Sequence, residues 1–189
     1  SGLLKKEESE YLVQLLEAFV NLTFSDLGIE TLVGRNAIEQ FCLILEQKHY
    51  QVTLEERFQK IAKLSLRVLG NMSINHEGKQ ECIDVRVIAR SYRYLEQSRE
   101  RSYDDALNVS LILMSISIHL EGKTQIIDEV DENGNPLILQ AIVKRLQTQQ
   151  YPNIRKNLKV CLCNVAELPR GFQDITRQLV EKIEILDEV

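Results

Sequence analysis

The chain has 189 residues, which is enough for one domain of ordinary size and too few for two large ones. Hydrophobic residues make up 44% and charged residues 27%, a balance typical of a folded domain in water rather than of a disordered or membrane-spanning chain. The formal net charge of −5 disfavours general nucleic-acid binding, which depends on neutralising phosphates. The opening Ser1-Gly2, with no initiator Met, is typical of a cloning scar, so we expect a single cytoplasmic domain over residues 3–189.

Apolar residues recur three and four positions apart in the long segments 12–22, 61–72, 107–118 and 154–165. This spacing is the period of an α-helix that buries one face, and no segment shows sustained alternation of period two. The sequence therefore predicts an all-α fold.

The end of each long helix carries a recurring pair of residues, an Asn or Ser and, seven residues later, a Gly. The pairs are Asn21 and Gly28, Asn71 and Gly78, Ser115 and Gly122, and Asn164 and Gly171. The glycines are 50, 44 and 49 residues apart, a period typical of an α-solenoid built from units of two or three helices. We expect the joints between units to lie near these glycines.

A short helix and then a medium helix are predicted after each glycine. In the second repeat these are the segments 79–85 and 86–97. In the third repeat, segment 123–129 is followed by a turn over 131–136, rich in Asp, Asn and Gly, and by a helix over 137–147. The start signals of the later long helices are Thr53, Ser102 and Pro152.

The chain resembles the armadillo repeat family in this order of helices and in the ends of two long helices, Leu69-Gly70-Asn71 and Leu162-Cys163-Asn164. The resemblance implies a right-handed α-solenoid of about four three-helix units and a non-enzymatic role as a protein-binding scaffold or adaptor. The family often has Trp four residues before the Asn. This chain has no Trp, and those four positions hold Glu17, Arg67, Leu111 and Val160.

Two short segments carry a narrower resemblance. Residues 120–123 and 166–171 are similar to turns in armadillo proteins of the ciliary radial spoke. This similarity implies a structural or assembly role in the axoneme of the cilium.

In armadillo proteins the Asn at the end of the long helix faces a concave groove, and the resemblance places the same face of each long helix in the groove of this chain. The implied groove residues are Gln14, Glu17, Asn21, Lys60, Lys63, Arg67, Asn71, Asp104, Asn108, Ser115, Asn153, Lys156, Asn157 and Asn164. Their charges alternate from unit to unit, acidic then basic. We expect a protein partner there, an extended peptide or a helix, although these residues could equally form a solvated face.

An alternative binding face is a basic stripe that begins with Arg86, Arg90 and Arg93 and continues to Arg99 and Arg101. Tyr92 and Tyr94 lie within it, and basic residues beside aromatic ones suit RNA or an acidic protein tail. A nucleic-acid-binding helical-repeat protein is therefore the second hypothesis. A solvated outer face that forms ion pairs explains the same residues.

Four groups of residues have part of a catalytic or metal-binding pattern. The four cysteines, Cys42, Cys82, Cys161 and Cys163, have neither zinc nor disulfide spacing and are predicted to be core residues. Gly122-Lys123-Thr124 lacks the first glycine of a phosphate-binding loop. The Glu129, Asp131, Asn133 and Gly134 series lacks the final Glu of a calcium loop and is predicted to be a turn. His49, His76 and His119 are not spaced for a metal or a nucleophile.

The sequence therefore predicts no enzyme, cofactor, metal, small-molecule substrate or membrane contact. It also predicts self-association, because the terminal units of a solenoid expose apolar helix faces unless they carry polar caps.

Overall fold

The computed structural model describes residues 6–47, 56–96, 103–148 and 150–187. In chain order the described helices are α1 (Lys6–Leu22), α2 (Asp26–Val33), α3 (Ala37–Glu46), α5 (Glu56–Ile74), α6 (His76–Asp84), α7 (Val87–Ser91), α8 (Arg93–Glu96), α9 (Tyr103–Ile116), α10 (Leu120–Asp128), α11 (Leu137–Thr148), α12 (Pro152–Ala166) and α13 (Pro169–Asp187). Within these ranges no strand forms, and an isolated bridge joins Val130 to Pro136. The all-α prediction is confirmed.

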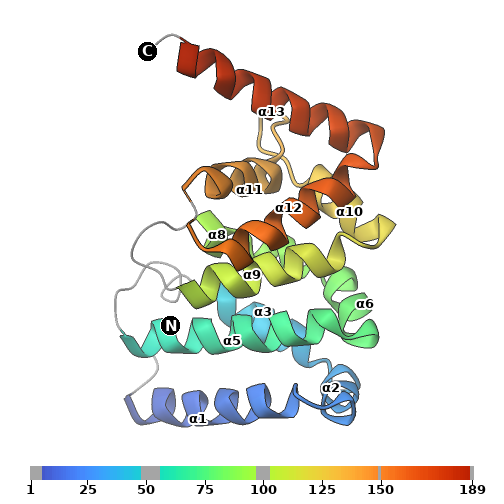
Figure 1. Cartoon of the computed structure of the whole chain (residues 1–189). Coiled ribbons are helices and arrows are strands. Elements are labelled where there is room, and N and C mark those ends of the chain that lie inside the picture. Colours follow the sequence, from blue (N-terminus) through green and yellow to red (C-terminus); the bar gives the residue numbers. More distant parts are fainter. Residues whose placement is uncertain (1–5, 48–55, 97–102, 149, 188–189) are drawn as a thin grey trace.

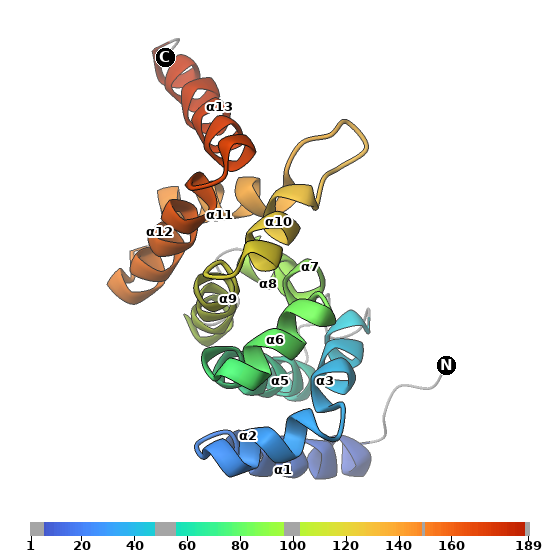
Figure 2. The ribbon, with the colours of Figure 1, turned by 90° about the vertical axis from the view of Figure 1, so that its right-hand side faces the viewer.

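The helices stack in repeating units. The long helices α1, α5, α9 and α12 follow one another in one layer, each packed against the next. The first helices of successive units, α2, α6 and α10, line one edge of the stack (Figure 1). The second helices α3, α7 with α8, and α11 lie behind the long helices, and Figure 2 shows the stack from the side. The molecule is an α-solenoid, as the sequence predicted.

A glycine lies just after each of the four joints between a long helix and the helix that follows it, α1–α2, α5–α6, α9–α10 and α12–α13. A Cβ atom added to the glycine would lie 2.0 to 2.4 Å from the carbonyl oxygen of the residue six positions earlier. The pairs are Gly28 with Leu22, Gly78 with Met72, Gly122 with Ile116 and Gly171 with Val165. Only a residue without a side chain allows the two helices to approach this closely, which explains why the glycine recurs.

Local caps start the first helices earlier than the sequence pattern suggested. The side-chain oxygen of Asn75 accepts a hydrogen bond from the backbone N–H of Glu77 at 3.0 Å, so α6 begins at His76 and not at residue 79. Ser25 caps α2 in the same way through the N–H of Gly28. Pro152 is the first residue of α12, as predicted. The predicted starts at Thr53 and Ser102 lie outside the described residues.

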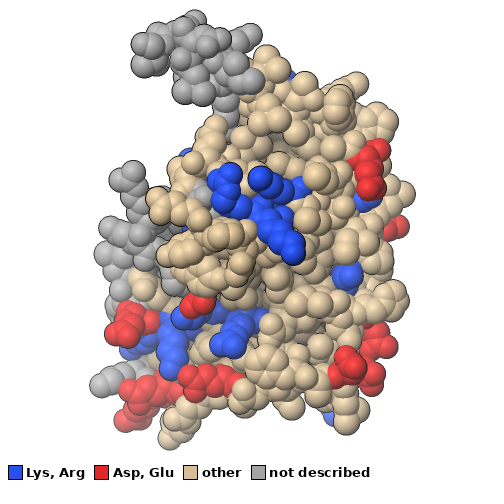
Figure 3. Space-filling model, in the orientation of Figure 1, with Lys and Arg blue, Asp and Glu red and all other residues tan. Residues whose placement is uncertain are grey.

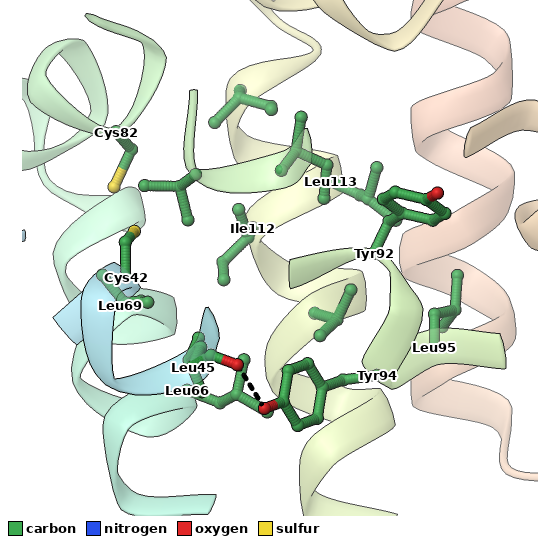
Figure 4. Packing of buried hydrophobic residues seen from close by; sticks show 14 of the residues in the cluster. Cys42, Leu45, Leu66, Leu69, Cys82, Tyr92, Tyr94, Leu95, Ile112 and Leu113 are labelled. Atoms are coloured by element: carbon green, nitrogen blue, oxygen red, sulfur yellow. Dashed lines mark hydrogen bonds between the residues drawn. The ribbon is translucent and has the colours of Figure 1, made fainter. Parts of the chain in front are cut away.

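The second helix of the second unit differs from the prediction of one helix over residues 86–97. It is broken into α7 and α8 at Tyr92. The break allows Tyr92 and Tyr94 both to be buried, whereas residues two apart on a continuous helix would point in nearly opposite directions. The Tyr94 hydroxyl donates a hydrogen bond of 2.9 Å to the carbonyl oxygen of Leu45 in the preceding unit (Figure 4).

The core is continuous through the stack, and three of the four cysteines belong to it. Cys42, Cys82 and Cys161 are buried among aliphatic side chains, and Figure 4 shows Cys42 and Cys82 close to each other. Burial raises the pKa of the Cys42 and Cys161 thiols to about 12, so both stay protonated at neutral pH. The core prediction is wrong for Cys163, which is exposed. Its place on α12 faces away from the preceding unit.

Candidate partner-binding groove

The predicted groove is the face of the long helices that Figure 3 shows. Exposed acidic residues lie along α1, and exposed Lys and Arg gather over α5 and again over α12 (Figure 3). The predicted residues that are exposed on this face are Gln14, Glu17, Asn21, Lys60, Arg67, Asn153 and Lys156. Lys63, Asn71, Asp104 and Asn164 are partly buried.

Three other predicted groove residues are buried. The solvent-accessible fraction of Asn108, Ser115 and Asn157 is below one tenth for each residue. A partner could not contact them without displacing the long helices, so they are not part of the accessible surface. The reason is the close packing of α9 between α5 and α12: a Cβ on Gly70 of α5 would lie 3.2 Å from Oδ1 of Asn108 on α9.

Asparagine side chains on the long helices bond to the preceding unit. Asn71 donates from Nδ2 to the Thr23 hydroxyl at 2.8 Å, and Asn164 donates to the Ser117 hydroxyl at 3.0 Å. Asn157 makes the same bond to Ser110 at 3.1 Å. The asparagines therefore tie neighbouring units together. Asn71 and Asn164 are only partly buried, and each keeps one amide hydrogen and its carbonyl oxygen for a partner.

Sequence reasoning missed the hydroxyl partners of these asparagines. Thr23 and Ser117 lie two residues after the markers Asn21 and Ser115, and Ser73 stands at the same place in the second unit. A hydroxyl at this constant offset was a signal in the sequence that could have indicated the bonds.

Oppositely charged groove residues on neighbouring long helices form ion pairs. Lys60 Nζ lies 2.8 Å from Oε1 of Glu17 on α1, and Lys63 pairs with Asp104 on α9. These side chains are about half exposed, so each pair contributes at most about 1 kcal/mol. Arg67 carries the exposed charge that remains on this part of α5, with its guanidinium 6.0 Å from the Phe24 ring.

A hollow of about 480 Å³ opens between α1 and α5 on the groove face. It is lined by Ser9, Glu10, Val13, Gln14, Glu17, Glu56, Arg57 and Lys60. Three of these residues, Gln14, Glu17 and Lys60, were predicted as groove residues. Glu10 was missed although it occupies the same position before its Asn marker as Lys60 does. Glu56 and Arg57 were missed because they lie further from the marker than the predicted positions extend.

The basic stripe of the alternative hypothesis is engaged in ion pairs. Arg90 donates to both carboxylate oxygens of Glu39, at 2.6 and 3.0 Å, and to both of Glu46, also at 2.6 and 3.0 Å. The hydrogen bond from Arg90 lowers the pKa of the Glu46 carboxyl, and bonds to Glu46 and Glu39 raise the pKa of Arg90. Nη2 of Arg86 lies 3.2 Å from Oε2 of Glu129.

The aromatic residues of that stripe are buried and cannot stack on bases. Arg93 is exposed, and Arg99 and Arg101 lie outside the described residues.

The loop that imitates a calcium site is held by its own backbone. The Asp131 carboxylate accepts hydrogen bonds from the backbone N–H groups of Asn133 and Asn135, at 2.8 and 2.9 Å. It also accepts one from the Asn135 side chain at 3.0 Å, and this bond is the main cause of the lowered Asp131 pKa. The turn prediction for these residues is confirmed.

Among the described residues, no group of three or more His, Cys, Asp or Glu side chains is placed to hold a metal ion. Over the same ranges, no helix has the length and apolar character needed to cross a membrane.

Comparisons with known proteins define the fold. No protein-family model matches the chain, and no curated protein matches it. An engineered protein of known structure is similar over 93% of this chain and 70% of its own, with a TM-score of 0.65 and 17% identity. A designed armadillo repeat protein is similar over 94% of this chain and 66% of its own, with a TM-score of 0.67 and 15% identity.

These likenesses show an armadillo-like α-solenoid, and the predicted resemblance is confirmed at the level of the fold. Folds of this kind are commonly protein-binding scaffolds without enzymatic activity.

Proposed function

We propose that this chain is a non-enzymatic scaffold that binds an extended protein segment or a helix on the concave face of its long helices. The observation that carries the proposal is the hollow between α1 and α5, which is lined by three residues of the predicted groove. Exposed Arg67 continues this surface along α5.

The charges around the hollow indicate the kind of segment that fits. Three carboxylates line it, Glu10, Glu17 and Glu56, against the two cations Arg57 and Lys60, so one negative charge is in excess; Lys60 is paired with Glu17. The remaining negative charge suits a Lys or Arg of the partner, and Arg67 further along α5 suits an Asp or Glu. The proposed partner is therefore a segment that carries both a basic and an acidic residue, and the charges set register and encounter rate more than affinity.

The finer part of the proposal is a cytoplasmic role in the cilium, as a structural or assembly component of the axoneme. It is supported by the resemblance of residues 120–123 and 166–171 to turns of radial-spoke armadillo proteins. Self-association through the terminal helices is also part of the proposal. The ion pairs of Arg86 and Arg90 and the burial of Tyr92 and Tyr94 disfavour the nucleic-acid alternative.

The test compares three baits in affinity capture from a lysate of ciliated cells: the parent, Arg67→Glu on the groove face, and Lys144→Glu on α11. Both substitutions exchange an exposed cation for an anion, so the second controls for the change in charge. Partners retained by the parent and Lys144→Glu but lost with Arg67→Glu support groove binding. Axonemal proteins among them support the ciliary role.

A synthetic peptide from any such partner then gives the decisive measurement. Its affinity for the parent, measured by fluorescence anisotropy, should fall at least tenfold with Arg67→Glu and stay unchanged with Lys144→Glu. Equal binding by all three proteins would overturn the groove. Salt-sensitive binding of single-stranded RNA, lost when Arg86 and Arg93 become Glu, would favour the alternative instead.

A further inference from the structure

The outer face of α1 exposes an apolar stripe at helical spacing. Tyr11, Leu15 and Leu22 are 71%, 50% and 44% exposed to solvent, and Ala18 between them is exposed as well. These four residues point away from α5, against which the other side of α1 packs. No described residue covers the stripe, which is therefore an exposed apolar helix face at one end of the described stack.

The same four positions are buried in each of the other long helices. Counted from the Asn or Ser marker, they are Ile61, Ser65, Val68 and Met72 on α5, Asp105, Val109, Ile112 and Ile116 on α9, and Ile154, Leu158, Cys161 and Val165 on α12. In those helices the stripe faces the preceding unit. The stripe on α1 thus has the position of a stacking face, and a long helix of another unit fits it.

The opposite end of the stack offers the matching face on α12. Lys156, Lys159 and Cys163 are exposed there and, with Gln150, Pro152, Arg155 and Val160, they line a hollow of about 670 Å³. On α5 the corresponding positions are Lys63, Leu66 and Gly70, and this face of α5 receives α9. The α13 helix packs against α12 and leaves Lys156, Lys159 and Cys163 exposed.

We propose that the occupant of the α1 stripe is α12 of a second copy of this chain, stacked in parallel as consecutive long helices are within one copy. The internal contacts fix the register. Lys63 of α5 pairs with Asp104 of α9, and the residues at the same positions on α12 and α1 are Lys156 and Glu10. A basic end of α12 then meets the acidic start of α1, which carries Glu7 and Glu10.

Neither Glu10 nor Lys156 has an ion-pair partner among the described residues, so both charges are available for this contact. The contact is heterologous, because each copy uses a different face at each end. Copies joined in this way form open chains, and the groove of one copy continues into that of the next. This inference deepens the self-association proposed above. The contact shares Glu10 and Gln14 with the hollow between α1 and α5, but it does not require a partner segment to bind there.

A disulfide tests the register directly. A Cβ on Gly70 would lie 3.5 Å from Cβ of Asn108, at the short end of the range of about 3.5–4.5 Å that a disulfide spans. The same positions in the proposed contact hold the exposed Cys163 of one copy and Gln14 of the next. Gln14→Cys should therefore form dimers and longer chains under mild oxidation, seen on a non-reducing gel and abolished by reductant.

Two controls accompany that variant: Gln14→Cys with Cys163→Ser, and Thr31→Cys, another exposed position, on α2. Both should run largely as monomers on the same non-reducing gel, since the other cysteines are buried. Cross-linking of Gln14→Cys no greater than that of Thr31→Cys would overturn the proposed register.

A mixing experiment tests the polarity of the contact by sedimentation velocity. Leu15→Glu disables the α1 face, and Lys156→Glu with Lys159→Glu disables the α12 face, so each protein alone should be a monomer. Their equimolar mixture keeps one intact face of each kind and should give a 1:1 dimer.

A parent that stays monomeric at high concentration would overturn the proposal. So would an α12 variant that still assembles alone, because α1 would then pair with α1. Arg67→Glu, which tests the groove, should leave assembly unchanged, so the two proposals can fail separately.

Discussion

The joints between units and the connections inside units differ in how closely they repeat. All four joints place a glycine against the same backbone carbonyl, with 2.0 to 2.4 Å between that oxygen and an added Cβ. The connections from first to second helix differ. Asn36 and Arg86 make a tight left-handed turn in two units, and the third unit has a loop over residues 129–136 that projects from the stack in Figure 2.

The difference follows from what surrounds each segment. At a joint two helix ends meet backbone to backbone, so the geometry can vary little and one residue type recurs. A connection inside a unit faces solvent, where several backbone conformations and lengths bring the next helix to the same place. A residue that recurs at every joint of this chain therefore indicates close backbone contact, and a connection whose sequence varies between units indicates exposure to solvent.

Gly122→Val should have the largest effect on the stability of the chain. The Cβ would lie 2.0 Å from the Ile116 carbonyl oxygen, so the joint must open and disrupt the packing of α10 against α12. We expect a loss of about 4 kcal/mol or a failure to fold. Urea denaturation measures the loss, and Gly78→Val should behave alike.

Gly34→Ala is the matched control for the joint glycines. Gly34 has a φ of −61°, and an added Cβ would lie 3.4 Å from its nearest neighbour, the Glu30 carbonyl oxygen. The alanine should therefore be tolerated or slightly stabilising. If Gly122→Val unfolds at the same urea concentration as Gly34→Ala, close packing at the joint glycines does not determine the stability of the stack.

Arg90→Met should have the next largest effect. The tight turn at Arg86 aims α7 so that Arg90 reaches Glu39 and Glu46 of α3, and the Arg90 side chain is only 16% exposed. Losing these charged hydrogen bonds should cost about 1–3 kcal/mol at pH 7, measured by urea denaturation.

The pH dependence sharpens the Arg90 prediction. Arg90 lowers the pKa of Glu46 below its ordinary value of 4.5, so Glu46 contributes its stability above that pH and loses it as the pH falls through the lowered pKa. The difference between parent and Arg90→Met should therefore shrink below about pH 4.5. A difference that stays constant down to pH 3 would mean that the pairs contribute little.

Much of the fold could be predicted from the sequence, because helical period and joint glycines are local signals with fixed offsets. The break between α7 and α8 could not, since it depends on the burial of both Tyr92 and Tyr94, and Tyr94 bonds to Leu45 of the preceding unit. Nor could the exposure of Cys163: its apolar neighbours suggested burial, but no described unit covers that face of α12.

That the long-helix face binds a partner stays a prediction, but the structure shows which of its predicted residues are accessible. Asn21, Lys60 and Arg67 are exposed, whereas Ser115 is buried. The pairing of Lys60 with Glu17, and of Asn71 with Thr23, depends on the distance between neighbouring long helices, which the sequence does not state. Burial of Asn108 and Asn157 has the same origin, because both side chains meet the preceding long helix.

Arg86→Asn should have a small, stabilising effect. Arg86 has a φ of 55°, a strained value for most residues, and Asn36 occupies the equivalent turn with a φ of 54°. Asn adopts this conformation more readily, so we expect a gain of about 0.5 kcal/mol, reduced by loss of the exposed pair with Glu129. Glu129→Gln removes that pair alone and is the reference in thermal melts. A variant less stable than Glu129→Gln would exclude strain at Arg86.

Asp131→Ala should have the smallest effect on global stability and a clear local one. It removes three hydrogen bonds that the carboxylate accepts inside the loop, while α10 and α11 stay packed against each other. The melting temperature should hardly change, but amide hydrogen exchange and proteolysis should rise over residues 129–136.

Because the pKa of Asp131 is lowered, the parent loop should loosen in the same way as acid protonates this carboxyl. Calcium that slows exchange in the parent but not in Asp131→Ala would instead make the loop a metal site. A large fall in the melting temperature would show that this connection constrains the stack as tightly as a joint does.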